Sequence, residues 1–179
     1  DSKETRQYFQ YKQVKEGIFT LMQDLFGLEI KPWQTSVWHD SVNAYEVLDQ
    51  GKLIGRFYLD MHPREGKYKH AAHMTLRKGI LNKQIPLSAL MCNFPGGDDS
   101  AGLMEHNQVE TFLHEFGHLI HAMLSGTQQW AGISGMAMER DFVEAPSQML
   151  EEWVWDYDTL SKFAVNTKGD VLPRTLFDK

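Results

Sequence analysis

Near the beginning of the chain, apolar side chains recur at three- and four-residue steps across residues 5–27. This spacing places them on one face of an amphipathic helix. Gly27 follows the last of them and is suited to end the helix, because glycine adopts the left-handed conformation at a helix C-terminus without steric cost. The apolar face consists of Tyr8, Tyr11, Val14, Ile18, Leu21, Met22 and Leu25.

The period of the apolar positions changes between about residues 42 and 81, where short runs alternate and are separated by turn residues. Two of these runs flank a turn that contains Gly51, which is typical of a β-hairpin. Two further runs predict strands before the loop signal at residues 95–100, which holds a proline and two glycines. The predicted strands are residues 42–48, 53–59, 70–76 and 86–94.

Helical spacing returns at residues 104–124, with an apolar face made by Val109, Phe112, Leu113, Phe116, Ile120 and Met123. A segment with glycine and glutamine, residues 125–135, separates this helix from another predicted at residues 139–157. The order is a helix, a small sheet and then helices. It predicts an α+β fold that is mainly helical, with a small antiparallel-containing sheet packed against the helices.

Composition narrows the class of protein. The 179 residues, 42% of them hydrophobic, suffice for one domain with a real core. The net charge of −6 gives no basic field to recruit nucleic acid or anionic lipid. No apolar run approaches the roughly 20 residues that span a bilayer. The single cysteine, Cys92, excludes an internal disulfide and suits a reducing compartment, so we expect a cytoplasmic protein with neither nucleic-acid nor membrane partners.

The candidate chemistry lies at residues 114–118, with the sequence His-Glu-Phe-Gly-His. On a helix, His114 and His118 lie on one face about 6 Å apart along the axis, so both imidazoles can reach one tetrahedral cation. Glu115 points to the side of this pair, where its carboxylate can contact a metal-bound water. Zinc lowers the pKa of such a water towards about 7, and the carboxylate takes its proton as it attacks a peptide carbonyl. The motif therefore predicts a zinc peptidase site.

Two plainer interpretations compete with this one: a chance match, and a solvated pair of histidines on a helix surface. The apolar residues around the motif, including Phe116, place the helix in a core and argue against both. Gly117 inside the helix costs about 1 kcal/mol relative to alanine, which suggests that something packs closely against that turn.

A catalytic zinc usually has three protein ligands and one open position. His121 is three residues from His118 but seven from His114, so a continuous helix carries it too far along the axis to share their ion. A carboxylate from the next predicted helix is the better candidate. Periodicity does not choose among Glu139, Asp141 and Glu144.

Several separate motifs, in this order, resemble the thimet oligopeptidase and oligopeptidase A family of zinc metallopeptidases. Together they extend the resemblance through essentially the whole chain. They are residues 55–72, 106–111, 112–121 and 141–148, together with Trp153.

The resemblance implies a zincin-like fold and one zinc ion per chain, held by His114, His118 and Glu144. It also implies that Glu115 is the general base in the hydrolysis of short oligopeptides. Family members are much longer, so residues 1–179 are expected to be a partial catalytic domain that lacks the N- and C-terminal parts of the full-length enzyme.

The missing C-terminal part would hold the family's transition-state donors, whose loss costs on the order of 100- to 1,000-fold in rate. The alternative is therefore a zinc- or peptide-binding fragment with little activity unless the missing segments are supplied as partners.

Two other segments have open interpretations. Residues 87–94 are expected either to be an edge strand that pairs with an extended peptide or an ordinary buried strand. Residues 63–68 mix turn residues with charges and an aromatic, which fits a functional loop or a solvated turn. Cys92 is expected to be a buried small residue rather than a nucleophile.

Overall fold

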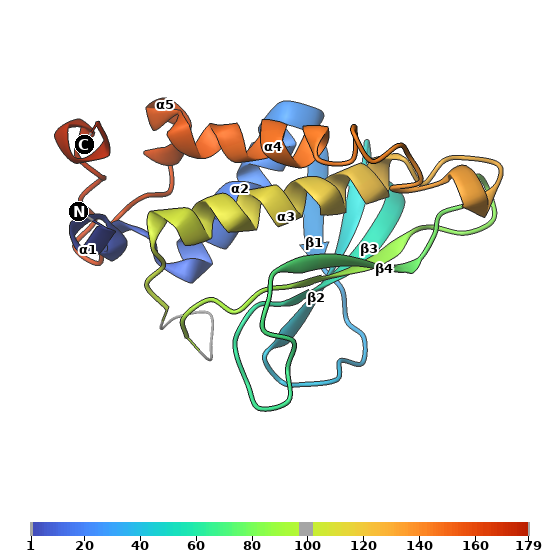
Figure 1. Ribbon diagram of the computed structural model, residues 1–179, viewed down its shortest axis with the longest axis horizontal. Helices are drawn as coiled ribbons and strands as arrows, with labels where there is room; N and C mark the ends of the chain where they lie inside the picture. The colour runs from blue at the N-terminus through green and yellow to red at the C-terminus, as the bar shows by residue number, and fades with distance from the viewer. Residues whose placement is uncertain (1, 97–101, 179) are drawn as a thin grey trace.

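The computed structural model describes residues 2–96 and 102–178. In a five-stranded sheet with the strand order β1-β2-β3-β5-β4, one face is covered by α2 and α3, and α4 packs on α3 (Figure 1). Among the described residues, helical residues outnumber strand residues, so the predicted α+β class, mainly helical and zincin-like, is confirmed. The strands are β1 Leu28–Pro32, β2 Val42–Asp49, β3 Lys52–Asp60, β4 Ala72–Arg77 and β5 Leu87–Met91. The longer helices are α2 Tyr11–Phe26, α3 His106–Leu124 and α4 Ala145–Glu151.

The predicted hairpin is present as β2 and β3. Gln50 and Gly51 connect the two strands with φ angles of 48° and 78°. Two consecutive residues with positive φ match the right-handed twist of the flanking strands, and glycine takes the second position at little cost. Inward-facing side chains of the two strands, including Val47 and Phe57, are fully buried against the helices.

The position of β5 in the sheet corrects the hypothesis that residues 87–94 form an edge strand. β5 runs parallel to β3 on one side and antiparallel to β4 on the other, so its backbone is paired on both sides. The edge on this side of the sheet is formed by β4 instead, and β1 forms the opposite edge. Strand β1 was not predicted, because it is short and ends at Pro32, and prolines are typical of strand edges and ends.

The first predicted helix is interrupted. A short helix α1 (Ser2–Thr5) and a 3-10 turn (Arg6–Tyr8) precede α2, and the chain between them is extended. The carbonyl of Phe9 accepts from the amide of Met104 at 2.8 Å, and the amide of Tyr11 donates to Gly102 at 2.9 Å. These long-range hydrogen bonds replace helical ones. Gly27 does end α2, with a φ of 69° and its amide bonded to the carbonyl of Gln23.

Helix α3 is the central element of the core. A capping box begins it: the backbone N–H of Glu105 donates to the side chain of Gln108 at 2.9 Å, and the Glu105 side chain accepts from the Gln108 amide. Its apolar face, including Phe112 and Phe116, is completely buried between α2 and the sheet. The preceding loop signal at residues 95–100 lies largely outside the described residues.

The second predicted helix, at residues 139–157, is also divided. Turns occupy residues 141–144, α4 follows, and a 3-10 turn (Glu152–Trp155) leads to α5 (Tyr157–Leu160). Pro146 lies in the first turn of α4, where backbone N–H groups have no partner within the helix, so its missing N–H costs nothing. If the helix began earlier, Pro146 would lie in its interior, where each N–H donates to the carbonyl four residues before it. The remaining short helices are a 3-10 turn at Ala131–Ile133 and α6 at Arg174–Phe177.

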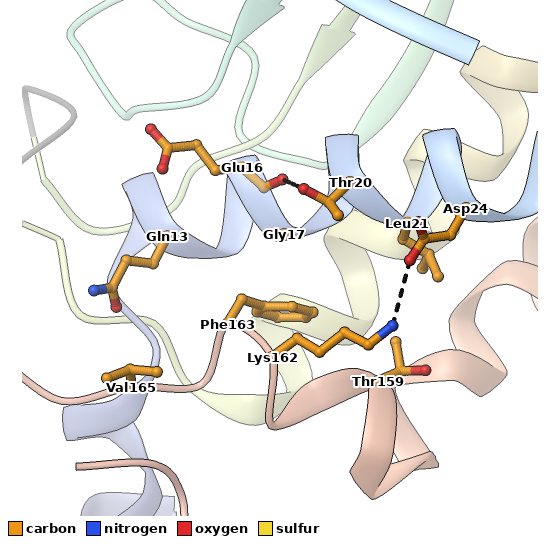
Figure 2. Close-up of a pocket in the computed structure, with 10 residues that line it drawn as sticks. All are labelled: Gln13, Glu16, Gly17, Thr20, Leu21, Asp24, Thr159, Lys162, Phe163 and Val165. Atoms are coloured by element: carbon orange, nitrogen blue, oxygen red, sulfur yellow. Dashed lines mark hydrogen bonds and ion pairs between the residues drawn. The ribbon is translucent and has the colours of Figure 1, made fainter. Parts of the chain in front are cut away.

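The segment after α5 packs back on α2 (Figure 2). Phe163 lies directly against the backbone at Gly17, where an added Cβ would come within 2.3 Å of the ring. Lys162 pairs with Asp24 at 3.3 Å at the rim of the same contact. Glycine at position 17 is therefore needed for this docking of the chain's last part.

Asp60, at the end of β3, anchors the crossover from β3 to β4. Its carboxylate is 1% exposed and accepts from Trp38 at 2.9 Å and from both terminal nitrogens of Arg64, at 2.6 and 2.8 Å. Lys67 reaches it at 3.0 Å, and also donates to the carbonyls of Asp60, His62 and Cys92. The Lys67 side chain is 2% exposed, so residues 63–68 are not simply a solvated turn.

Burial raises the pKa of the Asp60 carboxyl, but the hydrogen bonds from Arg64, Trp38 and Lys67 outweigh it and lower the pKa to about 2. Cys92 is completely buried, as predicted, and burial raises the pKa of its thiol. Among the described residues, no helix combines the length and apolar character needed to cross a membrane.

Candidate metal centre

Helix α3 presents His114 and His118 on one face, and the turn before α4 brings Glu144 towards them. The Nε2 atoms of His114 and His118 lie 3.2 and 3.1 Å from the same carboxylate oxygen of Glu144. Among the described residues, these three are the only group of histidine, cysteine and acidic side chains close enough to hold a metal ion. The structure thus brings together three of the predicted site residues.

The separations fit a single tetrahedral cation. Two bonds of 2.0–2.1 Å at a tetrahedral angle place their donor atoms about 3.3 Å apart. The observed 3.1 and 3.2 Å are close to that value. The donor set, two imidazoles and a carboxylate, is also one that zinc accepts in catalytic sites. The residues present therefore fit a zinc ion with one position open, and Glu144, whose side chain is 51% exposed, leaves the site accessible to solvent.

Glu144 occupies the N-cap position of α4, not the interior of a helix. Its backbone carbonyl accepts from the amide of Gln148 at 2.9 Å. The hydroxyl of Ser147 donates to the carbonyl of Glu144 at 2.9 Å and lies 3.0 Å from its carboxylate. Backbone and side chain are thus held together at the start of α4. Of the three carboxylates that spacing left open, Glu139 and Asp141 are not part of the group that could hold a metal ion.

The contact predicted at Gly117 is present. A Cβ at this position would lie 2.7 Å from the Cα of Ser147 and 3.1 Å from the carbonyl oxygen of Pro146. The backbone of α4 therefore packs directly on α3 at the turn between the two histidines. This close approach is what brings Glu144 within reach of them.

Substitution of Gly117 by alanine is expected to push α4 away from α3 and to weaken both metal binding and the fold. Overpacking of this kind costs about 1–3 kcal/mol. Zinc affinity by competition with a chromophoric chelator, and urea unfolding, measure the two effects. Gly132→Ala is the matched control, because nothing lies within 4 Å of the added Cβ. A Gly117→Ala protein that binds zinc as the parent does would refute this role of the contact.

Glu151 is a site residue that the sequence reasoning missed. Its carboxylate lies 2.6 Å from Nδ1 of His114, on the opposite side of the ring from Glu144. A carboxylate that accepts from Nδ1 fixes the ring orientation and tautomer, leaving Nε2 free to bind a metal. The signal was available: Glu151 follows Glu144 by seven residues, almost two full helical turns, and therefore shares its face.

The Glu151→Gln substitution is expected to lower zinc affinity by about 10- to 100-fold, because the imidazole of His114 loses its anionic hydrogen-bond partner. Glu152→Gln is the control, since Glu152 is the next residue but is exposed. The measurement is the zinc dissociation constant of each variant, compared with that of the parent protein. Equal constants for the two variants would mean that Glu151 does not orient His114.

Glu115 lies beside the histidine pair, partly buried under β4. Burial raises the pKa of its carboxyl; the charge of His114 and a hydrogen bond from the backbone amide of His73 oppose this, while the charge of Glu144 adds to it. A carboxylate with a raised pKa is a stronger base than an exposed one. Glu115 thus combines a position next to the histidines with a carboxyl pKa that burial raises, and both favour proton transfer.

His121 lies outside the three-residue group, as its spacing suggested. It lines a small apolar hollow with Phe26, Leu124 and Met149, and burial lowers the pKa of its imidazole. Its Nδ1 is buried and has no hydrogen-bond partner among the described residues. The structure thus gives His121 the surroundings of a neutral core histidine.

Sequence comparison identifies the class of protein that carries this site. The sequence profile described as peptidase family M3 matches residues 1–179, and the chain belongs to this family. It is 40% identical to a thimet-like oligopeptidase of Dictyostelium discoideum, over 89% of this chain and 25% of the relative. Oligopeptidase A of Escherichia coli is 35% identical over 97% of this chain and 27% of the relative. An organellar oligopeptidase A of Arabidopsis thaliana, named as chloroplastic and mitochondrial, is 32% identical over 100% of this chain and 24% of the relative.

The chain therefore spans about a quarter of the length of the curated relatives that it matches. The resemblance described from the sequence motifs is confirmed by the family match.

Proposed function

We propose that residues 1–179 form part of the catalytic domain of a zinc metallopeptidase that hydrolyses peptide bonds in short oligopeptides. In this proposal His114, His118 and Glu144 bind one zinc ion, and Glu115 is the general base. The observation that carries it is the convergence of both Nε2 atoms on the Glu144 carboxylate at 3.1–3.2 Å. The substrate class is taken from the relatives, whose names describe oligopeptidases.

The zinc ion, when bound, supplies a positive charge that acidifies a water molecule and polarises the peptide carbonyl. Glu115 accepts the proton of the attacking water at its carboxylate and later donates it to the leaving amine. Its partial burial raises the pKa of the carboxyl, which favours the first step. Glu151 holds the His114 ring through Nδ1, and Ser147 holds the carboxylate of Glu144.

The substrate backbone is proposed to bind along the open edge of β4. Within the described residues β4 pairs with β5 alone, and the backbone amide of its residue His73 donates to Glu115. An extended peptide that adds to this edge satisfies the unpaired backbone groups and lies next to the general base. The strand-pairing mode first considered for residues 87–94 thus suits β4.

The second candidate is a zinc- or peptide-binding fragment with little activity of its own. Relatives named as oligopeptidases do not favour this candidate, although the chain covers only about a quarter of each of them. Groups that stabilise the transition state would then come from other segments, supplied as partners. A cytoplasmic location stays a prediction, and relatives with chloroplastic and mitochondrial names show that the family is not restricted to that compartment.

The metal content of Glu144→Ala tests the proposed ligand set. The parent protein is expected to retain about one zinc per chain after loading and gel filtration, and the variant to retain much less, because two imidazoles alone leave the ion half-coordinated. Elemental analysis gives the ratio. Glu139→Ala and Asp141→Ala are matched controls that should keep their zinc. Unchanged zinc in Glu144→Ala, or its loss in a control, would refute the assignment of Glu144.

A further inference from the structure

A hollow of about 530 Å³ opens at the end of the sheet away from the β3–β4 crossover. Strand β3 begins at Lys52, but its pairing with β5 begins only at Arg56 and Leu87. The loop of residues 80–86 and the turn after α3 occupy the space beyond, and the hollow lies between them and β3. Its volume is in the range of sites that bind small ligands or a few residues of a peptide.

The charged side chains that line this hollow are all positive: Lys52, Arg56, Arg77 and Lys83. The chain as a whole has a net charge of −6, so this cluster is a local reversal of sign. In the described part of the chain, none of the ion pairs involves Lys52, Arg77 or Lys83. Arg56 has a loose one, 3.6 Å from Glu46, and its guanidinium is held 4.4 Å above the Trp33 ring. Lys52, Arg77 and Lys83 therefore carry positive charge that no ion pair between described residues neutralises.

The floor of the hollow is rigidly packed. A Cβ at Gly79 would lie 2.3 Å from the carbonyl oxygen of Gly126, and one at Gly126 would lie 2.8 Å from the ring of Pro86. The loop and the end of α3 are thus in direct backbone contact. The hollow is consequently a preformed feature of the fold, with an apolar base and a cationic rim.

A second hollow, of about 290 Å³, lies between α2 and the segment after α5 (Figure 2). Its lining contains both signs of charge, and its Lys162 already pairs with Asp24. It has no comparable excess of charge. The cationic hollow is therefore the one whose chemistry specifies a ligand.

The distance from the metal centre to the cationic hollow follows from the lengths of two elements that connect them, β4 and α3. Strand β4 runs from His73 to Arg77, four residues or about 13 Å. Helix α3 and its turn run from His118 to Gly126, eight residues or about 12 Å. The two lengths agree, so four residues of an extended peptide span the distance between the metal centre and the hollow.

We propose that this cationic hollow binds acidic side chains of the peptide substrate, four to five residues on the amino-terminal side of the cleaved bond. The inference rests on the proposed function. The amino-terminal side follows from an antiparallel alignment of the peptide with β4, the more common and more stable pairing. The carboxylates meet the rim lysines and arginines, and flanking apolar groups contact the base formed by Leu53 and Ile85. The hollow thereby favours acidic peptides without taking part in the chemistry.

The test uses three fluorescein-labelled peptides of eight residues and the zinc-loaded Glu115→Gln protein, in which binding is read without turnover. One peptide has two glutamates at its amino-terminal end, one has glutamines there, and one has the glutamates at its carboxyl end. We expect the first to bind about fivefold more tightly than the second at low salt, because two exposed ion pairs together contribute a free energy of that size. The third should resemble the second. The preference should disappear at about 1 M salt.

Lys52→Gln/Lys83→Gln in the same background should abolish the preference, since both lysines are exposed on the rim. The control is Lys12→Gln/Lys168→Gln, which removes the same amount of charge from α2 and from a distant turn. It should retain the preference for the acidic peptide. Equal binding of the first two peptides, a preference confined to the third, or a preference that survives the rim substitutions would overturn the proposal. Cleavage of the same peptides by the parent protein separates the two proposals. If the acidic peptide binds more tightly but no peptide is cleaved, the binding role of the hollow is retained and the peptidase activity is rejected. If the peptides are cleaved but bind equally, the peptidase activity is retained and the binding role of the hollow is rejected.

Discussion

Substitution of Glu115 by glutamine is expected to lower the rate of peptide hydrolysis by about 100- to 10,000-fold, the usual contribution of a general base. Glutamine has the same shape but cannot take a proton from the attacking water. The three residues proposed to bind zinc are untouched, so the metal content should stay at that of the parent protein. Initial rates with an internally quenched fluorescent peptide, in parallel with elemental analysis, measure both quantities.

Glu110→Gln is the matched control, because Glu110 lies on the same helix and outside the metal-binding group. It should cleave as the parent does. Equal turnover by the parent and the Glu115→Gln protein would show that Glu115 is not the base. Zinc binding without turnover in the parent and in Glu110→Gln as well would instead favour the second candidate, a binding fragment.

Substitution of Asp60 by asparagine is expected to reduce the free energy of unfolding by about 3–5 kcal/mol, as is typical when one partner of a buried ion pair is removed. The loss leaves Lys67, which is 2% exposed, without its counter-charge, and turns an amide group towards the donors Trp38 and Arg64. Urea unfolding of the zinc-free proteins gives the difference. Glu29→Gln breaks an exposed pair with Lys31 and should cost less than about 1 kcal/mol.

The effect of Asp60 should depend on pH in a defined direction. Its pKa is about 2 in the folded protein and about 3.9 in an unfolded chain. The folded state therefore holds fewer protons than the unfolded state in this range, and the stabilisation is complete above pH 4 and is lost as the pH falls towards 2. The parent and Asp60→Asn stabilities should converge over that interval. A constant difference down to pH 2 would show that the carboxylate charge is not what stabilises the crossover.

The half of the candidate metal centre that lies on one helix could be predicted from the sequence, because helical geometry alone relates His114 to His118. The other half depends on how α4 packs on α3, which local spacing does not encode. For that reason Glu139, Asp141 and Glu144 stayed equivalent until the family resemblance was considered. Glu151 was missed although its seven-residue offset from Glu144 could have indicated it.

The same division holds for the fold. The β2–β3 hairpin and the end of α2 at Gly27 were predicted, because each is determined by residues that are adjacent in sequence. Strand β1 and the division of the helix predicted at residues 139–157 have local causes, at Pro32 and Pro146, whereas two other errors involve distant contacts. The helix break at Phe9 is caused by hydrogen bonds to residues 102–104, and the interior position of β5 by the crossover that Asp60 anchors.

The most direct test of the central claim is anomalous diffraction at the zinc edge from crystals of the zinc-loaded protein. We expect one peak per chain, about 2.0–2.2 Å from Nε2 of His114, from Nε2 of His118 and from the Glu144 carboxylate. A peak bound by Glu139, Asp141 or His121 in place of Glu144, or no peak between α3 and α4, would contradict it.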